Sequence, residues 1–305
     1  MVAGLMRTAR FLGWREFVIA FLLMAVGTSL PNLFVGISSA RQGIPHLSLG
    51  DALGNNLVVL TAAVALGVLL SAKKEISTNS RTVQTTALYM VGASILPLLL
   101  ISDGILNRSD GLILIGFFVF YISWLFSKKE RFASRECENH DLASLSLGVK
   151  QFLKDLLKIA IGIGFLVLAA RGIIQAASFF AEELNAPLML IGILIVGLGN
   201  ALPEVYFVIA AARKNDTWLI LGNLMGSVVI LSTLVLGVVS LIHPIYILND
   251  FGNWEILALS RIFVVLAAIL FFIFSRLDRK ITAKESCILL AIYVIFVTSA
   301  VWFLN

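Results

Sequence analysis

The sequence predicts an all-α polytopic membrane protein built from two inverted-topology repeats. Its composition, the length of its apolar runs and an internal repeat support this fold class. The 305 residues are 59% hydrophobic and 13% charged, and the mean hydropathy is +0.98. A soluble domain carries about 25% charged residues. Composition therefore places most of the chain in a lipid bilayer.

Apolar runs follow one another along the chain, and short polar connections separate them. Each run is near the roughly 20 residues that a helix needs to cross about 30 Å of hydrocarbon. None has the alternating pattern of a strand, and a lipid-exposed chain must satisfy its backbone hydrogen bonds internally. We therefore predict about nine transmembrane helices, at residues 16–40, 47–71, 84–103, 110–127, 155–179, 186–212, 217–242, 254–275 and 285–304.

The basic residues predict the orientation. Of the 23 Lys and Arg residues, Arg41 and Arg108 fall on one side of these spans, and Arg171 and Arg261 fall inside spans. All the others fall on the opposite side, which the positive-inside rule assigns to the cytoplasm. We expect an integral protein of the plasma membrane with its N-terminus in the cytoplasm and its C-terminus outside. The sequence pI of about 9.3 then reflects orientation and contact with lipid headgroups, and gives no support for nucleic-acid binding.

An internal repeat divides the chain into halves. At an offset of 172 residues, segment 27–61 aligns with segment 199–233 without a gap. The first copy opens the first span and the second copy opens the sixth, so the copies enter the membrane from opposite sides. We expect a first half at 1–127, a cytoplasmic linker loop at 128–150 and a second half at 151–305. The identical pairs include Gly27/Gly199, Pro31/Pro203, Arg41/Arg213, Gly50/Gly222 and Gly54/Gly226.

Inverted repeats are typical of secondary transporters, whose ion sites lie near the bilayer midplane between the two copies. Proline has no N–H, so Pro31 and Pro203 leave the carbonyls of Gly27 and Gly199 without their helical donors. We predict helix breaks at these four residues. An unpaired carbonyl in hydrocarbon is tolerated where it lines a wet cavity, and a bound cation would satisfy it. The alternative is that each proline only kinks its helix.

The polar residues beside these prolines are candidate cation ligands. Glu204 is an acidic residue that lies well inside a predicted span. A carboxylate in the membrane interior is a candidate functional group by default. The alternative is a structural partner for Arg171 or Arg261. Side-chain and carbonyl oxygens suit hard cations such as Ca²⁺ and Na⁺. The predicted ion-binding residues are Glu204, Ser227, Asn200, Thr28, Ser29, Asn32 and Asn55.

These stretches resemble the cation/Ca²⁺ exchanger superfamily, whose repeats carry G-T/S-S-x-P-E in one helix and G-N-x-x-G-S in the next. Here the matching stretches are GTSLPN with GDALGN, and GNALPE with GNLMGS. The resemblance extends over nearly the whole chain. It implies a cation antiporter with alternating access, usually of ten spans. The extra span precedes the first repeat, and MVAGLMRTAR resembles at most its tail.

The chain departs from the family at the ion site. The family places one glutamate in each repeat; Glu204 matches the second position, but Asn32 occupies the first. One carboxylate cannot neutralise Ca²⁺, so we expect weakened Ca²⁺ affinity or a preference for a monovalent ion. Asp51 is a candidate additional acidic group, since it lies one turn before Asn55. The alternative is that Asp51 caps the start of the second span at the outer surface.

Three functional hypotheses remain open. The first is a secondary active antiporter of the sodium/calcium exchanger type. The second is a monovalent cation (Na⁺ or K⁺)/H⁺ antiporter that uses Glu204 alone. The third is a structural or regulatory membrane homologue without transport activity. We expect no enzyme chemistry and no cofactor, with Ca²⁺ and Na⁺ (or H⁺ and K⁺) as transported ions and with membrane lipids as the other partners.

Overall fold

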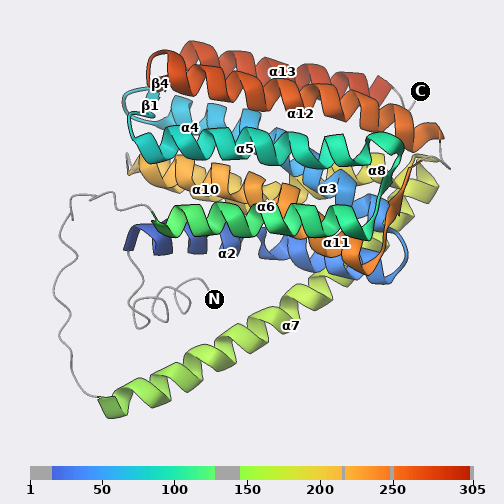
Figure 1. Cartoon of the computed structure of the whole chain (residues 1–305), viewed down its shortest axis with the longest axis horizontal. Helices are drawn as coiled ribbons and strands as arrows, with labels where there is room; N and C mark the ends of the chain where they lie inside the picture. The colour runs from blue at the N-terminus through green and yellow to red at the C-terminus, as the bar shows by residue number, and fades with distance from the viewer. Residues whose placement is uncertain (1–15, 128–144, 215–216, 248–250, 303–305) are drawn as a thin grey trace.

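The computed structural model describes residues 16–127, 145–214, 217–247 and 251–302. In this part of the chain the long helices run side by side as one bundle, except α7, which runs at an angle away from it (Figure 1). The first half contains α2 (Glu16–Arg41), α3 (Pro45–Val58) continuing through η1 (Val59–Ala63) into α4 (Val64–Leu70), α5 (Arg81–Leu100) with the short turn η2 (Ile101–Asp103), and α6 (Arg108–Ser127). The second half contains α7 (Leu145–Glu183), α8 (Leu188–Ile191) continuing through η3 (Gly192–Val196) into α9 (Gly197–Arg213), α10 (Thr217–Val229) continuing through η4 (Ile230–Val235) into α11 (Leu236–Ile242), α12 (Phe251–Leu277) and α13 (Ala283–Trp302).

The predicted fold class is confirmed. By length and composition, eight helices of the described residues can cross a membrane, and α2 is the ninth long helix. The predicted fifth span lies within α7, whose apolar segment is Gly164–Glu183. Helix α7 begins at Leu145, within the linker predicted at residues 128–150. Residues 128–144 of that linker lie outside the described residues.

Three short π-helical segments interrupt the long helices, and two of them occupy equivalent places in the two repeats. Segment η1 spans Val59–Ala63 and segment η4 spans Ile230–Val235. At the repeat offset, Val59 corresponds to Leu231 and Ala63 to Val235. A π segment often marks a functional place in a helix. The repeat found in the sequence therefore extends to the backbone.

A short antiparallel clasp closes each end of the bundle. At one end β1 (Glu75–Ser77) pairs with β4 (Lys280–Thr282), and Glu75 lies opposite Thr282. At the other end β2 (Ile105–Leu106) pairs with β3 (Ile245–Tyr246). Each clasp joins a connection of the first half to a connection of the second half. Neither clasp includes α2 or α7.

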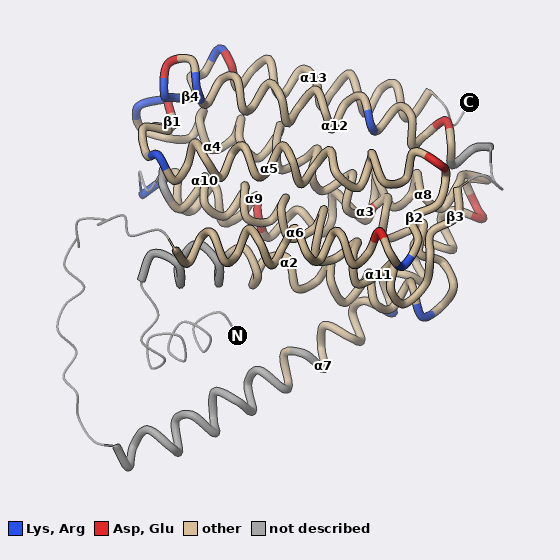
Figure 2. The backbone as a smooth tube through the Cα atoms, in the orientation of Figure 1, with Lys and Arg blue, Asp and Glu red and all other residues tan. Residues whose placement is uncertain are grey.

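Charged residues gather at the two ends, and Lys and Arg are concentrated at the β1–β4 end (Figure 2). Lys280 forms an ion pair with Glu75 there, at 3.0 Å between Nζ and Oε2. The hydrogen bond and charge of Glu75 raise the pKa of Lys280. The long stretches between the ends carry few charges, as expected for helices in hydrocarbon.

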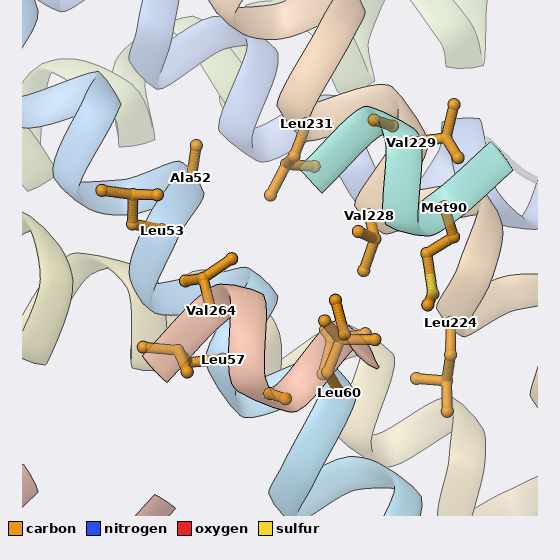
Figure 3. Packing of buried hydrophobic residues seen from close by; sticks show 14 of the residues in the cluster. Ala52, Leu53, Leu57, Leu60, Met90, Leu224, Val228, Val229, Leu231 and Val264 are labelled. Atoms are coloured by element: carbon orange, nitrogen blue, oxygen red, sulfur yellow. The ribbon is translucent and has the colours of Figure 1, made fainter. Parts of the chain in front are cut away.

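Apolar side chains fill the space between the central helices (Figure 3). Leu57 from α3, Met90 from α5, Val228 from α10 and Val264 from α12 are buried in one cluster. In hydrocarbon such packing supplies van der Waals contact rather than a hydrophobic driving force. The core therefore holds α3 and α10, the second helix of each repeat, in fixed positions.

Thr78 reinforces the β1–β4 clasp, and its replacement by valine is expected to weaken it. The buried Thr78 hydroxyl donates to the backbone oxygen of Ser275 at 2.6 Å. Valine keeps the shape but leaves that carbonyl unpaired, which costs about 1–2 kcal/mol. A fall in the thermal denaturation midpoint of the detergent-purified protein measures this loss. Ser77→Ala, at the exposed last residue of β1 next to Thr78, is the control and should leave the midpoint unchanged.

Candidate functional site

Helices α3 and α9 touch through their glycines. A methyl group added to Gly54 would lie well inside contact distance of the Ile193 carbonyl. A methyl group on Gly197 would lie 2.8 Å from the backbone nitrogen of Asn55. Small residues allow such close helix approach in membranes. The contact brings the polar residues of α3 beside those of α9.

Each of the four repeat helices presents two polar residues one helical turn apart, and residues four apart share one face of a helix. The four pairs are Thr28 and Asn32 in α2, Asp51 and Asn55 in α3, Asn200 and Glu204 in α9, and Asn223 and Ser227 in α10. The first two pairs correspond to the last two at the repeat offset of 172 residues. All are buried except Thr28, which is half-buried.

Two hydrogen bonds connect these pairs across the repeats. The Thr28 hydroxyl lies 3.3 Å from Oδ1 of Asn223 and 3.2 Å from the backbone oxygen of Ala25, and it can donate to either one. The side-chain amide of Asn200 donates to Oδ1 of Asp51 at 3.0 Å. Thr28 corresponds to Asn200 and Asp51 corresponds to Asn223, so the two bonds are equivalent under the internal symmetry. They fix α2 against α10 and α3 against α9.

Glu204 lies on α9, which contacts α2, α3 and α10, and its side chain is 0% exposed. Neither carboxylate oxygen has a hydrogen-bond partner among the described residues. Asn200, one turn before Glu204 on the same face of α9, donates to Asp51 at 3.0 Å, so Asp51 lies on the Glu204 side of the α3–α9 contact. A buried carboxylate without a partner is costly, and pairing with a cation removes that cost.

Other polar groups of the cluster also lack partners. Both side-chain amide atoms of Asn32 and of Asn55 are buried and form no hydrogen bond with any described residue. The same holds for the hydroxyl of Ser29. Buried polar groups in proteins are normally hydrogen-bonded, so a set of unpaired ones indicates a place where a water molecule or an ion can bind. The amide and hydroxyl oxygens are ligands that Ca²⁺ and Na⁺ accept.

The sequence-predicted ligands thus lie on α2, α3, α9 and α10, helices that pack against one another. Ser227 is buried in α10, where its hydroxyl donates to the Leu224 carbonyl at 3.1 Å. A hydroxyl bonded in this way keeps its oxygen lone pairs available. The Ser227 oxygen therefore remains able to coordinate a cation.

The interpretation of Asp51 as a helix cap is wrong. Helix α3 begins at Pro45 with Ile44 as its N-cap residue, so Asp51 lies well inside the helix. Its side chain is 1% exposed. The sequence placed the start of this span too late, at residue 47, because His46 and Pro45 are not typical of a membrane helix. The buried position leaves Asp51 as a candidate acidic group of the site.

The predicted helix breaks are also wrong. Helices α2 and α9 continue without interruption through Pro31 and Pro203. Gly199 and Pro203 lie on an exposed face of α9, whereas Asn200 and Glu204 are buried. Gly27 and Pro31 are half-buried in α2. The carbonyl that Pro203 leaves without a donor therefore lies away from the carboxylate of Glu204.

The two repeats differ in what covers this proline face. On α2, Phe34 packs with Ala170, Ile174 and other residues of α7. Its counterpart on α9, Tyr206, is 76% exposed. The described part of the chain therefore has a helix against α2 without an equivalent helix against α9.

The basic residues inside the spans do not pair with Glu204. Arg261 donates to the backbone oxygen of Ile101 at 2.9 Å and lies over the ring of Trp254. Arg171 is exposed on α7. Among the described residues, the ion pair found is that of Lys280 with Glu75, at the end of the bundle. The alternative role of Glu204 as a structural partner for an arginine has no support in these contacts.

Three polar residues of this region were not among the predicted ligands. Asn223 accepts the bond from Thr28. The amide of Asn56 donates to the Ser232 hydroxyl at 2.8 Å, and the Asn56 carbonyl oxygen is unpartnered in the described part of the chain. Asn223 could have been found from its correspondence with Asp51 at the repeat offset. Asn56 and Ser232 have apolar counterparts, so the repeat gives no signal for them.

Comparison with known families gives a match over most of the chain. The model described as "Sodium/calcium exchanger protein" matches residues 1–127 and 154–302. Each matched segment contains one of the two repeats.

Individual relatives agree with this match. A "Putative antiporter CaxA" of Alkalimonas amylolytica is 26% identical over 299 residues, which cover 96% of this chain and 90% of that protein. A "Sodium/calcium exchanger MaX1" of Methanosarcina acetivorans is 23% identical and covers 94% of this chain and 89% of its own length. A solved structure of the sodium-calcium exchanger NCX_Mj, soaked with Na⁺ and Sr²⁺, superposes with a TM-score of 0.67 at 25% identity. It covers 98% of this chain and 91% of the solved one.

Proposed function

The chain belongs to the sodium/calcium exchanger protein family, and from this premise we propose that it is a secondary active antiporter of the sodium/calcium exchanger type. The observation that supports the proposal most is the buried polar cluster around Glu204. The carboxylate of Glu204, the amide oxygens of Asn32 and Asn55 and the hydroxyl of Ser29 have no partner among the described residues, and they lie on helices of both repeats. Such a set of oxygen ligands suits a dehydrated Ca²⁺ or Na⁺ ion.

The ion-binding residues in this proposal are Glu204, Ser227, Asn200, Thr28, Ser29, Asn32 and Asn55. Ca²⁺ and Na⁺ occupy the site alternately, because both ions compete for the same carboxylate of Glu204. Exchange then follows from alternating access: an ion that binds from one side is released on the other, and the counter-ion crosses in the opposite direction.

The helix contacts support a division into a fixed part and a sliding part. The two clasps tie the connections next to α4, α5, α6, α11, α12 and α13 to one another. Helix α7 lies outside both clasps and packs on α2 through small and branched side chains such as Ala170 and Ile174. We assign the gating movement to α7, sliding against α2 and the rest of the bundle.

The orientation belongs to the same proposal. The basic β1–β4 end (Figure 2) faces the cytoplasm by the positive-inside rule, and the protein resides in the plasma membrane. This places the N-terminus in the cytoplasm and the C-terminus outside.

The test is ion flux in proteoliposomes that contain the purified full-length chain. Vesicles loaded with Na⁺ and diluted into Na⁺-free buffer with ⁴⁵Ca²⁺ should accumulate ⁴⁵Ca²⁺. A sodium ionophore, which dissipates the gradient, should abolish the uptake. Uptake equal to that of protein-free vesicles would contradict the proposal.

A second candidate function is exchange of a monovalent cation for H⁺. Asn32 favours it, because a neutral amide stands at the position that corresponds to Glu204 in the other repeat. In this case ²²Na⁺ uptake should follow an imposed pH gradient, and Ca²⁺ should neither be transported nor compete. The same vesicles distinguish the two functions.

A further inference from the structure

The two repeats supply one buried carboxylate each, at different positions. In the second repeat the acid is Glu204 on α9 and the amide is Asn223 on α10. In the first repeat the corresponding positions are exchanged: the amide is Asn32 on α2 and the acid is Asp51 on α3. Each repeat thus contributes one acid and one amide. The charge of a two-acid site is kept, but it is moved from α2 to α3.

Asp51 is placed to act together with Glu204. The amide of Asn200 donates to Asp51 at 3.0 Å, and Asn200 lies one turn before Glu204 on the same face of α9. Both carboxylates therefore belong to the helix pair α3–α9, which is held in close contact at Gly54 and Gly197. The amides Asn32 and Asn223 lie on the opposite pair, α2–α10.

Neither carboxylate has a cationic partner in the described residues. Both side chains are buried, at 1% and 0% exposure, and the ion pair found in that part of the chain involves Lys280 and Glu75. Unpaired carboxylates inside a membrane protein are expensive and usually mark an ion pathway. Two such groups beside the unpartnered amides of Asn32 and Asn55 suit an ion of charge +2.

We propose that Asp51 supplies the second negative charge of the site, so that Asp51 and Glu204 together neutralise a divalent cation of the Ca²⁺ class. This rests on the proposed cation-exchange function and specifies its substrate. Asp51 takes over the charge that Asn32 lacks. The site is accordingly selective for divalent over monovalent ions, since a monovalent ion needs only one of the two charges.

The charge of Asp51 can be separated from its hydrogen bond. Asp51→Asn keeps a carbonyl oxygen for the Asn200 amide and almost the same volume, but removes the charge. The double variant Asn32→Asp/Asp51→Asn restores the charge at the other position and again conserves volume. Asp103→Asn, at an exposed position of the β2–β3 end, is the matched control. Denaturation midpoints of the full-length purified variants are measured against Ca²⁺ and Na⁺ concentration.

The Ca²⁺ concentration that gives half-maximal stabilisation should rise at least tenfold in Asp51→Asn and return toward the wild-type value in the double variant. The loss is expected because a nearby charge in a poorly screened site interacts strongly with a divalent ion. The Na⁺ response should change less, and Asp103→Asn should match the wild type. An unchanged Ca²⁺ response in Asp51→Asn overturns this inference. A loss of Ca²⁺ affinity in Asp51→Asn that the double variant does not restore also overturns it, since the position of the residue rather than the charge of the site would then determine the affinity.

The two proposals fail in distinguishable ways. If the wild type transports Ca²⁺ and Asp51→Asn has the same Ca²⁺ affinity, only the proposed role of Asp51 is overturned. A wild-type protein with neither Ca²⁺-dependent stabilisation nor gradient-driven ⁴⁵Ca²⁺ flux overturns the exchange function and this inference with it.

Discussion

Glu204→Gln is expected to abolish gradient-driven ⁴⁵Ca²⁺ uptake while the protein remains folded. Glutamine has nearly the same shape, but it cannot neutralise a bound cation. Removing one partner of a buried charge pair costs about 3–5 kcal/mol, which corresponds to a loss of affinity of more than about 100-fold. Initial uptake rates in proteoliposomes with an outward Na⁺ gradient measure the effect.

In the absence of bound ions, Glu204→Gln should not destabilise the protein. Glu204 is 0% exposed and has no hydrogen-bond partner among the described residues, and a neutral amide is cheaper to bury than an unpaired carboxylate. The variant should therefore be at least as stable as the wild type without ions. Glu255→Gln, at an exposed position of α12, is the matched control and should transport normally. Full transport by Glu204→Gln would show that the site is elsewhere.

Gly54→Ala is expected to cause the largest loss of stability. The added methyl group would overlap the carbonyl of Ile193 and lie 2.8 Å from two further backbone atoms of that residue. Backbone cannot move aside as a side chain can, so α3 and α9 must separate. Overpacking of this kind costs about 1–3 kcal/mol, and separating α3 from α9 also pulls apart Asp51 and Asn200. Loss of a monodisperse peak in size-exclusion chromatography, or a large fall in the denaturation midpoint, measures the effect.

Gly116 provides the control for this substitution. It lies in α6 with no atom within 4 Å of the position that a methyl group would take. Alanine is favoured over glycine in helices by about 1 kcal/mol, so Gly116→Ala should be neutral or slightly stabilising. If Gly54→Ala were equally well tolerated, the close contact of α3 with α9 would not hold in the protein.

Much of the fold was predictable because hydrocarbon imposes strong rules on sequence. A membrane helix needs a long apolar run and satisfies its own backbone, so the spans and the inverted repeat could be found from residues alone. Glu204 was predictable for the same reason: a carboxylate in an apolar run needs an explanation. Helix ends were less certain, because Pro45 and His46 are polar or helix-breaking residues that nevertheless begin α3.

The details of the site were harder to predict. Proline removes one donor, but it does not have to end a helix, and the sequence cannot reveal that α2 and α9 continue through Pro31 and Pro203. The π segments η1 and η4 change the hydrogen-bond pattern without a diagnostic residue. The burial of Asp51 depends on the position of α9, which is fixed by glycine contacts between residues far apart in the chain. Such long-range contacts cannot be deduced from local pattern.

The central claim is that the cluster around Glu204 binds the transported cation. The most direct test is the denaturation midpoint of the purified wild type, Glu204→Gln and Glu255→Gln at increasing Ca²⁺ concentration. A ligand that binds only the folded protein stabilises it by about 2.7 kcal/mol at 100 times its Kd. The midpoint should rise with Ca²⁺ in the wild type and in Glu255→Gln and stay constant in Glu204→Gln. Equal rises in all three proteins would contradict the assignment of the site.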